Sequence, residues 1–202
     1  MTNALLYVLV AVISYLIGSV CVGVILSVQF WKKDVRNYGS KSAGATNVLR
    51  NMGFLFGLLT FLGDLLKVAI ACWIGMAIIG RTGGMVAGIF AVLGHNWPIY
   101  YKFKGGKGVA GSLGAMLVMF PLPAVFSMLA AIGIIAITKF VSVGSMTLLS
   151  VFAIILTVQY WGQWGIVLWA WFLAGLCIYR HKANIQRLKI GSENKLSFKS
   201  KS

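Results

Sequence analysis

Long apolar segments alternate with short polar interruptions along the whole chain. The apolar segments cover approximately residues 4–29, 54–79, 84–99, 108–120, 124–138, 143–158 and 163–179. A helix needs roughly 20 mainly apolar residues to cross the ~30 Å hydrocarbon core of a bilayer, and several segments are long enough. The pattern predicts an all-α polytopic membrane protein, a single domain over residues 1–202 with about seven transmembrane helices.

Two of the segments, 108–120 and 124–138, are shorter than a full crossing. As helices they measure ~20–22 Å, at 1.5 Å per residue. They form either two short spans or a re-entrant hairpin, and both arrangements return the chain to the side it left. The number of spans is therefore five to seven, and we expect seven.

The basic residues predict an orientation. The 18 Lys and Arg residues far outnumber the 3 Asp and Glu residues, and all but Lys67 and Arg81 fall in alternate interruptions or in the C-terminal tail. Because cytoplasmic loops are enriched in Lys and Arg, we expect the N-terminus outside and the C-terminus in the cytoplasm. The expected cytoplasmic segments are 31–53, 100–108, 139–143 and 180–202.

Composition and charge disfavour several function classes. Hydrophobic residues make up 59% of the chain and charged residues only 10%, where soluble domains carry about 25% charged residues. The net charge of +15 comes without a nucleic-acid-binding module, so it fits anionic lipid headgroups better than nucleic acid. With Asp34, Asp64 and Glu193 as the only acids, neither a paired-carboxylate hydrolase, nor a Ser-His-Asp triad, nor a metal centre is supported.

The first polar stretch with candidate chemistry covers residues 39–50, GSKSAGATNVLR. Small residues let backbone N–H groups approach an anion closely, hydroxyls donate hydrogen bonds, and arginine binds phosphate through two parallel bonds. The stretch does not match a Walker A loop, and a flexible loop is the alternative. The candidate phosphate-binding residues are Ser40, Gly44, Ala45, Thr46, Asn47 and Arg50.

The second stretch covers residues 94–108, GHNWPIYYKFKGGKG. Lys107 lies among three glycines, where the backbone can fold tightly around an anion. Lipid headgroups are the alternative partners of Lys102 and Lys104, and a structural hydrogen bond is the alternative role of the histidine. The candidates here are His95, Asn96, Lys104, Gly105, Gly106 and Lys107.

The third stretch follows the last apolar segment. If the helix continues, His181 and Asn184 lie at i and i+3 on one face, with Glu193 further along the tail. Lys182, Arg187 and Lys189 also fit a simpler interpretation, in which basic side chains at a helix end extend to the lipid headgroups. That interpretation does not account for His181 and Asn184. Ser142 and Ser145, at the start of segment 143–158, suit either an anion or a helix cap.

Together these motifs resemble the acyl-phosphate:glycerol-3-phosphate acyltransferase (PlsY) family. The matching patterns, in order, are G-S-x-x-x-G-A-T-N-V-L-R, G-H-N-x-P-x-x-x-K-F-K-G-G-K-G-V-A and H-x-x-N-I-x-R-L-x-x-G-x-E-N-K, and Gly63-Asp64-Leu65-Leu66-Lys67 is also similar. Residues 41–43, Lys-Ser-Ala, depart from the commoner Gly-Asn-Ile, so no role is assigned to Lys41 or Ser42.

The resemblance implies an enzyme of bacterial phospholipid synthesis in the cytoplasmic (inner) membrane. It would transfer a fatty acyl group from acyl phosphate to the 1-hydroxyl of glycerol 3-phosphate, giving lysophosphatidic acid and phosphate. It would need no metal, no other cofactor and no acyl-CoA, and we expect a monomer surrounded by membrane lipids. The expected catalytic residues are Ser40, Arg50, Lys107, His181 and Asn184.

Two groups could take the proton from the attacking hydroxyl. The H-x-x-x-x-D pair of other glycerolipid acyltransferases is absent, because Tyr100 follows His95 and Gln186 follows His181 at that spacing. His181 has a suitable unperturbed pKa, and a phosphate oxygen of a substrate is the other candidate. We favour the substrate, with His181 orienting it.

Two other functions share the spans and the basic loops. A transporter for a small phosphorylated solute would place polar groups near midplane in broken helices, often within inverted repeats, whereas here they cluster at one interface and no repeat is seen. A lipid-binding scaffold would need the basic residues but not the ordered Gly/Ser/Asn/His pattern.

Overall fold

The computed structural model describes residues 3–196, and within that range the regular structure is entirely helical. Lys199 and Lys201 of the predicted basic tail lie outside the described residues. The described helices fall into two compact units, residues 3–119 and Phe120–Leu196.

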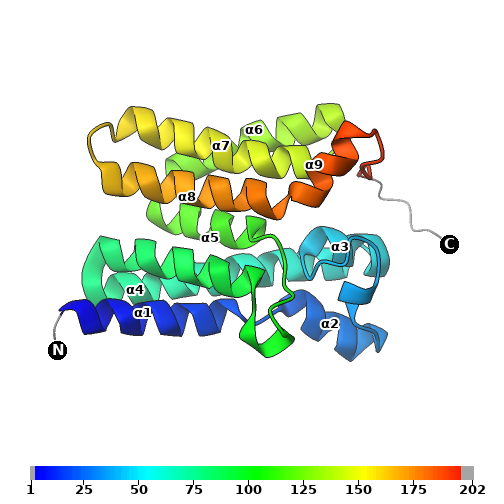
Figure 1. Ribbon diagram of the computed structural model, residues 1–202, viewed down its shortest axis with the longest axis horizontal. Coiled ribbons are helices and arrows are strands. Elements are labelled where there is room, and N and C mark those ends of the chain that lie inside the picture. Colours follow the sequence, from blue (N-terminus) through cyan, green and yellow to red (C-terminus); the bar gives the residue numbers. More distant parts are fainter. Residues whose placement is uncertain (1–2, 197–202) are drawn as a thin grey trace. The chain divides into compact units, whose positions relative to one another are not determined.

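In the first unit, α1 (Asn3–Gly18) and α2 (Val22–Trp31) replace the single apolar segment 4–29. The chain leaves the helix over Ser19–Cys21, where Ser19 Oγ donates to the Tyr15 carbonyl at 2.8 Å. Because the helix is interrupted here, the Val20 carbonyl accepts a hydrogen bond from Lys67 Nζ instead of from a backbone N–H of its own helix. Figure 1 shows α1 alongside α4 (Phe54–Asn96), and Gly18 and Gly94 allow the close approach, because a methyl group at either would overlap the opposing backbone.

The 43-residue helix α4 is a hairpin rather than one long rod. Ile79 (φ −137°, ψ 24°) and Gly80 (φ 67°, ψ −157°) leave the helical region. The two halves then pack back to back, since a methyl group at Gly75 would overlap the Gly83 carbonyl and the reverse also holds. The predicted break at residues 80–84 therefore begins one residue earlier, and Gly80 supplies the positive φ that the reversal requires.

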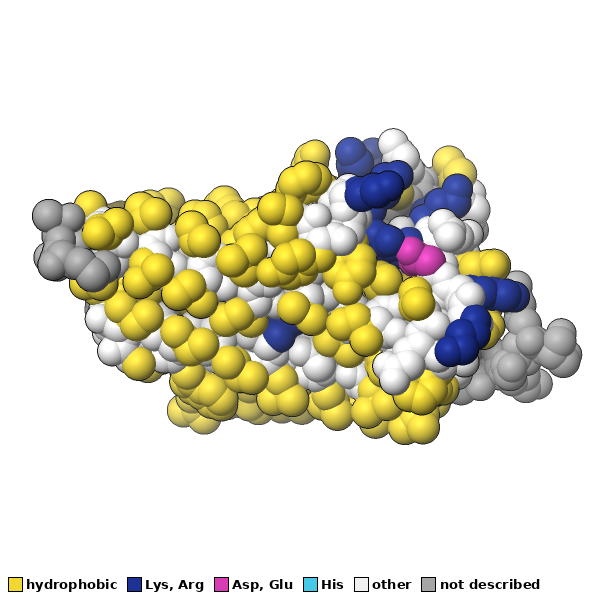
Figure 2. All heavy atoms as spheres, turned by 90° about the horizontal axis from the view of Figure 1, so that it is seen from below, with side chains coloured by type: hydrophobic (Ala, Val, Ile, Leu, Met, Phe, Trp, Pro, Cys, Tyr) yellow, Lys and Arg dark blue, Asp and Glu magenta, His cyan; other side chains and the backbone are white. Residues whose placement is uncertain are grey.

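Short elements fill the polar stretches of this unit. A 3-10 helix η1 (Val35–Asn37) and the helix α3 (Ala45–Met52) lie within the predicted loop 31–53, and a second 3-10 helix, η2 (Ile99–Tyr101), precedes the glycine-rich turn. That turn leads into α5 (Val109–Met119). Figure 2, viewed from the side on which α1 and α2 lie in Figure 1, shows hydrophobic side chains over most of this face and Lys and Arg gathered at its α2 end.

The second unit contains α6 (Pro121–Thr138), α7 (Val141–Gln159), α8 (Trp164–Arg180) and the short α9 (Lys182–Lys189). Pro121 opens α6, as proline often does at a first helical position. α7 packs against α6 and α8, around a cluster in which the Phe120 ring lies 6.2 Å from Phe152 and 5.7 Å from Trp169. The turn between α6 and α7 is only Lys139–Phe140, so Ser142 lies in the first turn of α7.

Four stretches of the described chain are long and apolar enough to cross a membrane: Ala4–Trp31, Phe54–Tyr101, Pro121–Thr138 and Val141–Gln159. Val109–Met119 and Trp164–Arg180 are shorter apolar helices. The prediction of an all-helical chain with several apolar helices is confirmed for residues 3–196.

Candidate active site

Asn47, a predicted phosphate ligand, organises the first loop with its own side chain. Its buried Nδ2 donates to the carbonyls of Val35 (3.0 Å), Tyr38 (3.1 Å) and Ser42 (2.9 Å). Its Oδ1 accepts from the Ser40 backbone N–H at 3.0 Å. A single amide thus closes residues 35–47 into a fixed loop, and the backbone position of Ser40 follows from it.

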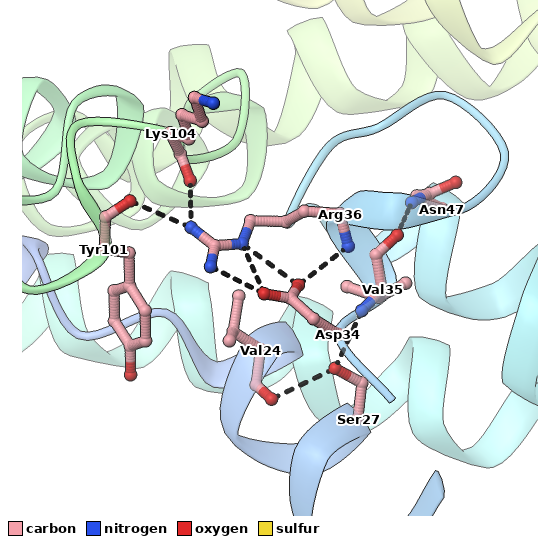
Figure 3. Close-up of polar contacts among 8 residues, drawn as sticks. All are labelled: Val24, Ser27, Asp34, Val35, Arg36, Asn47, Tyr101 and Lys104. Atoms are coloured by element: carbon pink, nitrogen blue, oxygen red, sulfur yellow. Dashed lines mark hydrogen bonds and ion pairs between the residues drawn. The ribbon is translucent and has the colours of Figure 1, made fainter. Parts of the chain in front are cut away.

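A second contact joins this loop to the glycine-rich turn (Figure 3). Arg36 pairs with Asp34, with Nη2 2.6 Å from Oδ2. Its Nη1 donates to the carbonyl oxygens of Tyr101 (2.9 Å) and Lys104 (3.0 Å). The bond from Arg36 lowers the pKa of the Asp34 carboxyl and keeps it charged, so the guanidinium stays oriented toward the two carbonyls. We call this arrangement the Arg36 clamp.

The two predicted stretches of the first unit therefore lie together. Besides the clamp, the Ala43 N–H donates to the Gly105 carbonyl at 3.4 Å. This places the loop with Ser40, Gly44 and Thr46 next to the turn with Lys104, Gly105 and Gly106. Lys107 and Arg50 are half-buried, whereas Lys104 is exposed.

Two helices begin in these loops. Gly44 is the N-cap of α3, so Ala45 and Thr46 lie in its first turn, and Arg50 follows Thr46 at i+4 on the same face. α5 begins directly after Lys107 and Gly108. The first N–H groups of a helix lack intrahelical acceptors and carry partial positive charge, which is the arrangement that favours bound phosphate.

His95 and Asn96, at the end of α4, are buried beneath the glycine turn. Gly106 donates its N–H to the His95 carbonyl at 3.1 Å, and a methyl group at Gly106 would overlap the His95 ring. On its other side the His95 Nδ1 lies 3.1 Å from Lys67 Nζ, which is itself 2.7 Å from Asp64 Oδ1. Asn96 is fully buried, and within the described chain its side-chain amide has no hydrogen-bond partner.

In the second unit the predicted residues gather around Glu193. Its Oε1 accepts from Asn184 Nδ2 (2.6 Å) and Ser142 Oγ (2.8 Å), and its Oε2 accepts from Arg187 Nε (2.8 Å). Burial alone would raise the pKa of this carboxyl, but the three bonds outweigh burial and lower the pKa below its usual value. Glu193 is thus a charged anchor for Asn184. Ser145 instead donates to the Val141 carbonyl of its own helix.

His181 is held at the junction of α8 and α9. Its Nδ1 lies 2.8 Å from the carbonyl oxygen of Cys177. A carbonyl can only accept, so Nδ1 carries a proton. In the neutral form of the ring, Nε2 is then the nitrogen that can accept a proton or a hydrogen bond.

All three acids of the chain are committed to basic partners. Asp34 pairs with Arg36, Asp64 with Lys67 and Glu193 with Arg187. Among the described residues, no Asp or Glu is therefore left without a basic partner. This arrangement favours binding of anions and leaves general-base chemistry to a histidine or to a substrate.

Comparison with known proteins identifies the family. The sequence model of the family "Glycerol-3-phosphate acyltransferase" matches residues 8–191. The chain belongs to the glycerol-3-phosphate acyltransferase family. It is 44% identical over 192 residues to the glycerol-3-phosphate acyltransferase of Thermoanaerobacter pseudethanolicus, covering 95% of this chain and 96% of that one. The corresponding enzyme of Halalkalibacterium halodurans is 41% identical, covering 92% and 93%.

Solved structures of the family share the fold. A crystal structure of PlsY, an integral membrane glycerol 3-phosphate acyltransferase in its glycerol 3-phosphate form, superposes with a TM-score of 0.89 at 35% identity, covering 95% of this chain and 96% of that one. A lysophosphatidic acid form of PlsY gives a TM-score of 0.85 at 34% identity, with the same coverage. The family resemblance carried by the three motifs is therefore confirmed, and so is the prediction of a helical membrane protein.

The sequence did not reveal several residues that shape the site. Asp34 and Arg36 lie outside the family motifs quoted above, and the two carbonyls that Arg36 binds are at least 65 residues away in the sequence. Asp64 and Lys67 belong to the segment that resembles the family, but their contact with His95 was not apparent from the sequence.

Proposed function

We propose that this chain transfers a fatty acyl group from acyl phosphate to the 1-hydroxyl of glycerol 3-phosphate. The products are lysophosphatidic acid and inorganic phosphate. Family membership and the likeness to a PlsY structure in its glycerol 3-phosphate form carry the proposal. The two linked loops of the first unit, with Arg50, Lys107 and the starts of α3 and α5, supply the positive groups that two anionic substrates need.

In the proposed reaction the hydroxyl oxygen of glycerol 3-phosphate attacks the acyl carbonyl carbon. The bond from that carbon to the phosphate oxygen breaks, and phosphate leaves with the electron pair. The hydroxyl proton passes to a phosphate oxygen of a substrate, with His181 as the alternative acceptor, since its Nε2 has the lone pair. Ser40, Arg50, Lys107 and Asn184 would bind and orient the phosphates, so proximity and charge stabilisation supply most of the rate. The step requires no metal or cofactor.

The remaining candidates are assigned to substrate binding under the same proposal. The backbone around Gly44 and the hydroxyl of Thr46 would hold one phosphoryl group. Asn47 and Glu193 would contribute chiefly by fixing the loops and side chains that meet the substrate. The other members of this set are Ala45, His95, Asn96, Lys104, Gly105, Gly106, Ser142 and Ser145.

For the topology we propose seven spans. They are α1 with α2, the two halves of α4, and α5, α6, α7 and α8, with the N-terminus outside and the C-terminus in the cytoplasm. The chain is then a single catalytic domain, a monomer in the cytoplasmic membrane, with segments 31–53, 100–108, 139–143 and 180–202 on the cytoplasmic side. A membrane-impermeant thiol reagent in intact cells should label Arg81→Cys but not Lys102→Cys; the reverse result would refute the orientation.

The activity itself is tested with purified protein in detergent. Acyl phosphate and labelled glycerol 3-phosphate should give labelled lysophosphatidic acid, and acyl-CoA in the same assay should give none. Arg50→Ala and Asn184→Ala should each lose most of the rate, and Lys102→Ala, on an exposed side chain, should lose little. Failure to form lysophosphatidic acid, together with uptake of glycerol 3-phosphate into proteoliposomes, would establish the transporter instead.

A further inference from the structure

Three ionisable side chains meet inside the first unit, away from the charged surface. Asp64 is 1%, Lys67 8% and His95 3% exposed. The Lys67 ammonium has three acceptors around it: Asp64 Oδ1 at 2.7 Å, His95 Nδ1 at 3.1 Å and the Val20 carbonyl, freed by the break between α1 and α2, at 2.5 Å. An ammonium has three donors and no acceptor; here it is hydrogen-bonded to His95 Nδ1 and the Val20 carbonyl and paired by charge with Asp64.

The protonation of His95 follows from these contacts. A Lys67 ammonium that donates to Nδ1 requires a lone pair on that nitrogen, so the ring proton lies on Nε2. A doubly protonated ring would bring two cations within 3.1 Å of each other in a buried site. A neutral Lys67 is disfavoured because the Asp64 carboxylate is closer to Lys67 Nζ (2.7 Å) than to His95 Nδ1 (3.4 Å).

The opposite edge of the ring faces the glycine turn. A methyl group at Gly106 would overlap Nε2, and one at Gly105 would overlap the His95 carbonyl. The turn therefore packs closely against His95. It continues directly into Lys107 and the start of α5. A change of tautomer or a rotation of the ring would alter the surface on which the turn rests.

We propose that Lys67, anchored by Asp64 and the Val20 carbonyl, is a positioning residue that fixes His95 as the neutral Nε2–H tautomer beneath the Gly105–Gly106 turn. The effect on substrate rests on the proposed function, in which Gly105 and Gly106 of this turn belong to the substrate-binding residues. The other histidine, His181, donates from Nδ1 to Cys177. The two histidines are thus held in opposite tautomers.

Nitrogen NMR tests the tautomers without any reference to catalysis. The chain contains two histidines, so ¹⁵N-histidine labelling in detergent at pH about 8 gives two sets of ring signals, which His181→Asn assigns. We expect His95 to be protonated on Nε2 alone and His181 on Nδ1 alone. A His95 ring protonated on Nδ1, or on both nitrogens, would overturn the proposal.

The positioning role is tested with the double variant Asp64→Leu/Lys67→Met. It removes both charges together, so no unpaired charge is left buried, and replacing a buried ion pair by apolar residues is often neutral for stability. The His95 signals should shift toward a mixture of tautomers while those of His181 stay unchanged. The KM for glycerol 3-phosphate should rise about tenfold, the size of one hydrogen bond to a charged group, with kcat much less affected. Lys102→Met makes the same lysine replacement on an exposed side chain and should change neither.

The outcomes separate the two proposals. A wild-type protein that forms no lysophosphatidic acid refutes the function but leaves the tautomer result standing. An active double variant with wild-type KM and an unchanged His95 tautomer refutes the positioning role and leaves the function intact. If the double variant is folded, as judged by unchanged His181 signals, and has the full activity of the wild-type protein, then the Asp64–Lys67 pair is only structural.

Discussion

Asn184 donates its side-chain amide to Glu193 across 2.6 Å, the shortest of the three bonds that the carboxylate accepts. The orientation of Asn184, one of the proposed phosphate-binding residues, is therefore set by an acid further along the tail. Arg187 balances the charge of that acid from the other oxygen. An anionic substrate at Asn184 would thus meet an amide whose carboxylate partner is already neutralised.

Replacing Glu193 by Gln should weaken both stability and activity. The amide that replaces one carboxylate oxygen cannot accept from all three donors, and the loss of bonds to a buried charged group costs about 1.5–3 kcal/mol. We expect a lower thermal unfolding midpoint and a large drop in acyl transfer. An unchanged midpoint would mean that the three bonds contribute nothing to stability.

The same carboxylate predicts a pH dependence. Since the folded state lowers the pKa of Glu193, its contribution to stability is present above the unfolded pKa, about 4.3, and is lost as the pH falls through the lower folded value. The wild-type unfolding midpoint should therefore fall more steeply between about pH 5 and 3 than that of Glu193→Gln. Parallel curves for the two proteins would contradict this assignment.

Asn47→Asp tests whether Asn47 acts as a donor to the loop. Aspartate near a helix N-terminus is normally favourable, but it cannot donate to the carbonyls of Val35, Tyr38 and Ser42. We expect a loss of stability of roughly 1–3 kcal/mol together with a loss of activity. Asn37→Asp, the same change on an exposed side chain, is the control. If both variants behave alike, the amide bonds do not hold the loop.

Substitutions of Arg36 and Asp34 separate the contribution of their ion pair from that of the bonds between Arg36 and the two carbonyls. The side chains of the pair are 20% and 25% exposed, and an ion pair that still contacts solvent contributes about 0–1 kcal/mol. Each bond from the guanidinium to a carbonyl is worth roughly 1.5–3 kcal/mol. Arg36→Ala should therefore raise the KM for glycerol 3-phosphate far more than Asp34→Ala, and Arg36→Lys should rescue little because it loses the planar fork. Equal effects of the two alanine variants would mean that the ion pair, and not the bonds to the carbonyls, accounts for the effect of the Arg36 clamp.

The sequence predicted the helices better than it predicted the contacts between loops. Apolar length was enough for most helix boundaries, because that signal is local. The eight-residue helix α3 was missed, since its polar residues lack a membrane pattern and it is stabilised by the packing of Val48 and by Asn47. The three motifs identified most of the candidate residues, but they did not reveal what each side chain contacts.

The roles depend on partners that are distant in sequence. Asn47 was predicted to meet phosphate, yet its amide is occupied by backbone carbonyls of its own loop. Arg36 carries no motif signal because it binds the backbone of Tyr101 and Lys104, whose side-chain identity does not matter for those bonds. Backbone contacts of this kind leave no residue-type pattern that sequence reasoning could use.

Gly106→Ala tests the contact on which the glycine turn depends. Gly106 does not have a positive φ, so the backbone tolerates alanine and the cost lies in the overlap with the His95 ring. We expect a raised KM for glycerol 3-phosphate. The control is Gly133→Ala in α6, where a methyl group meets open space and helix propensity should stabilise the protein by about 0.5–1 kcal/mol. Adding His95→Ala to Gly106→Ala removes the overlap. If the double variant folds normally but its KM stays high, the ring itself positions the turn. If both folding and KM return to normal, His95 has no role beyond filling space.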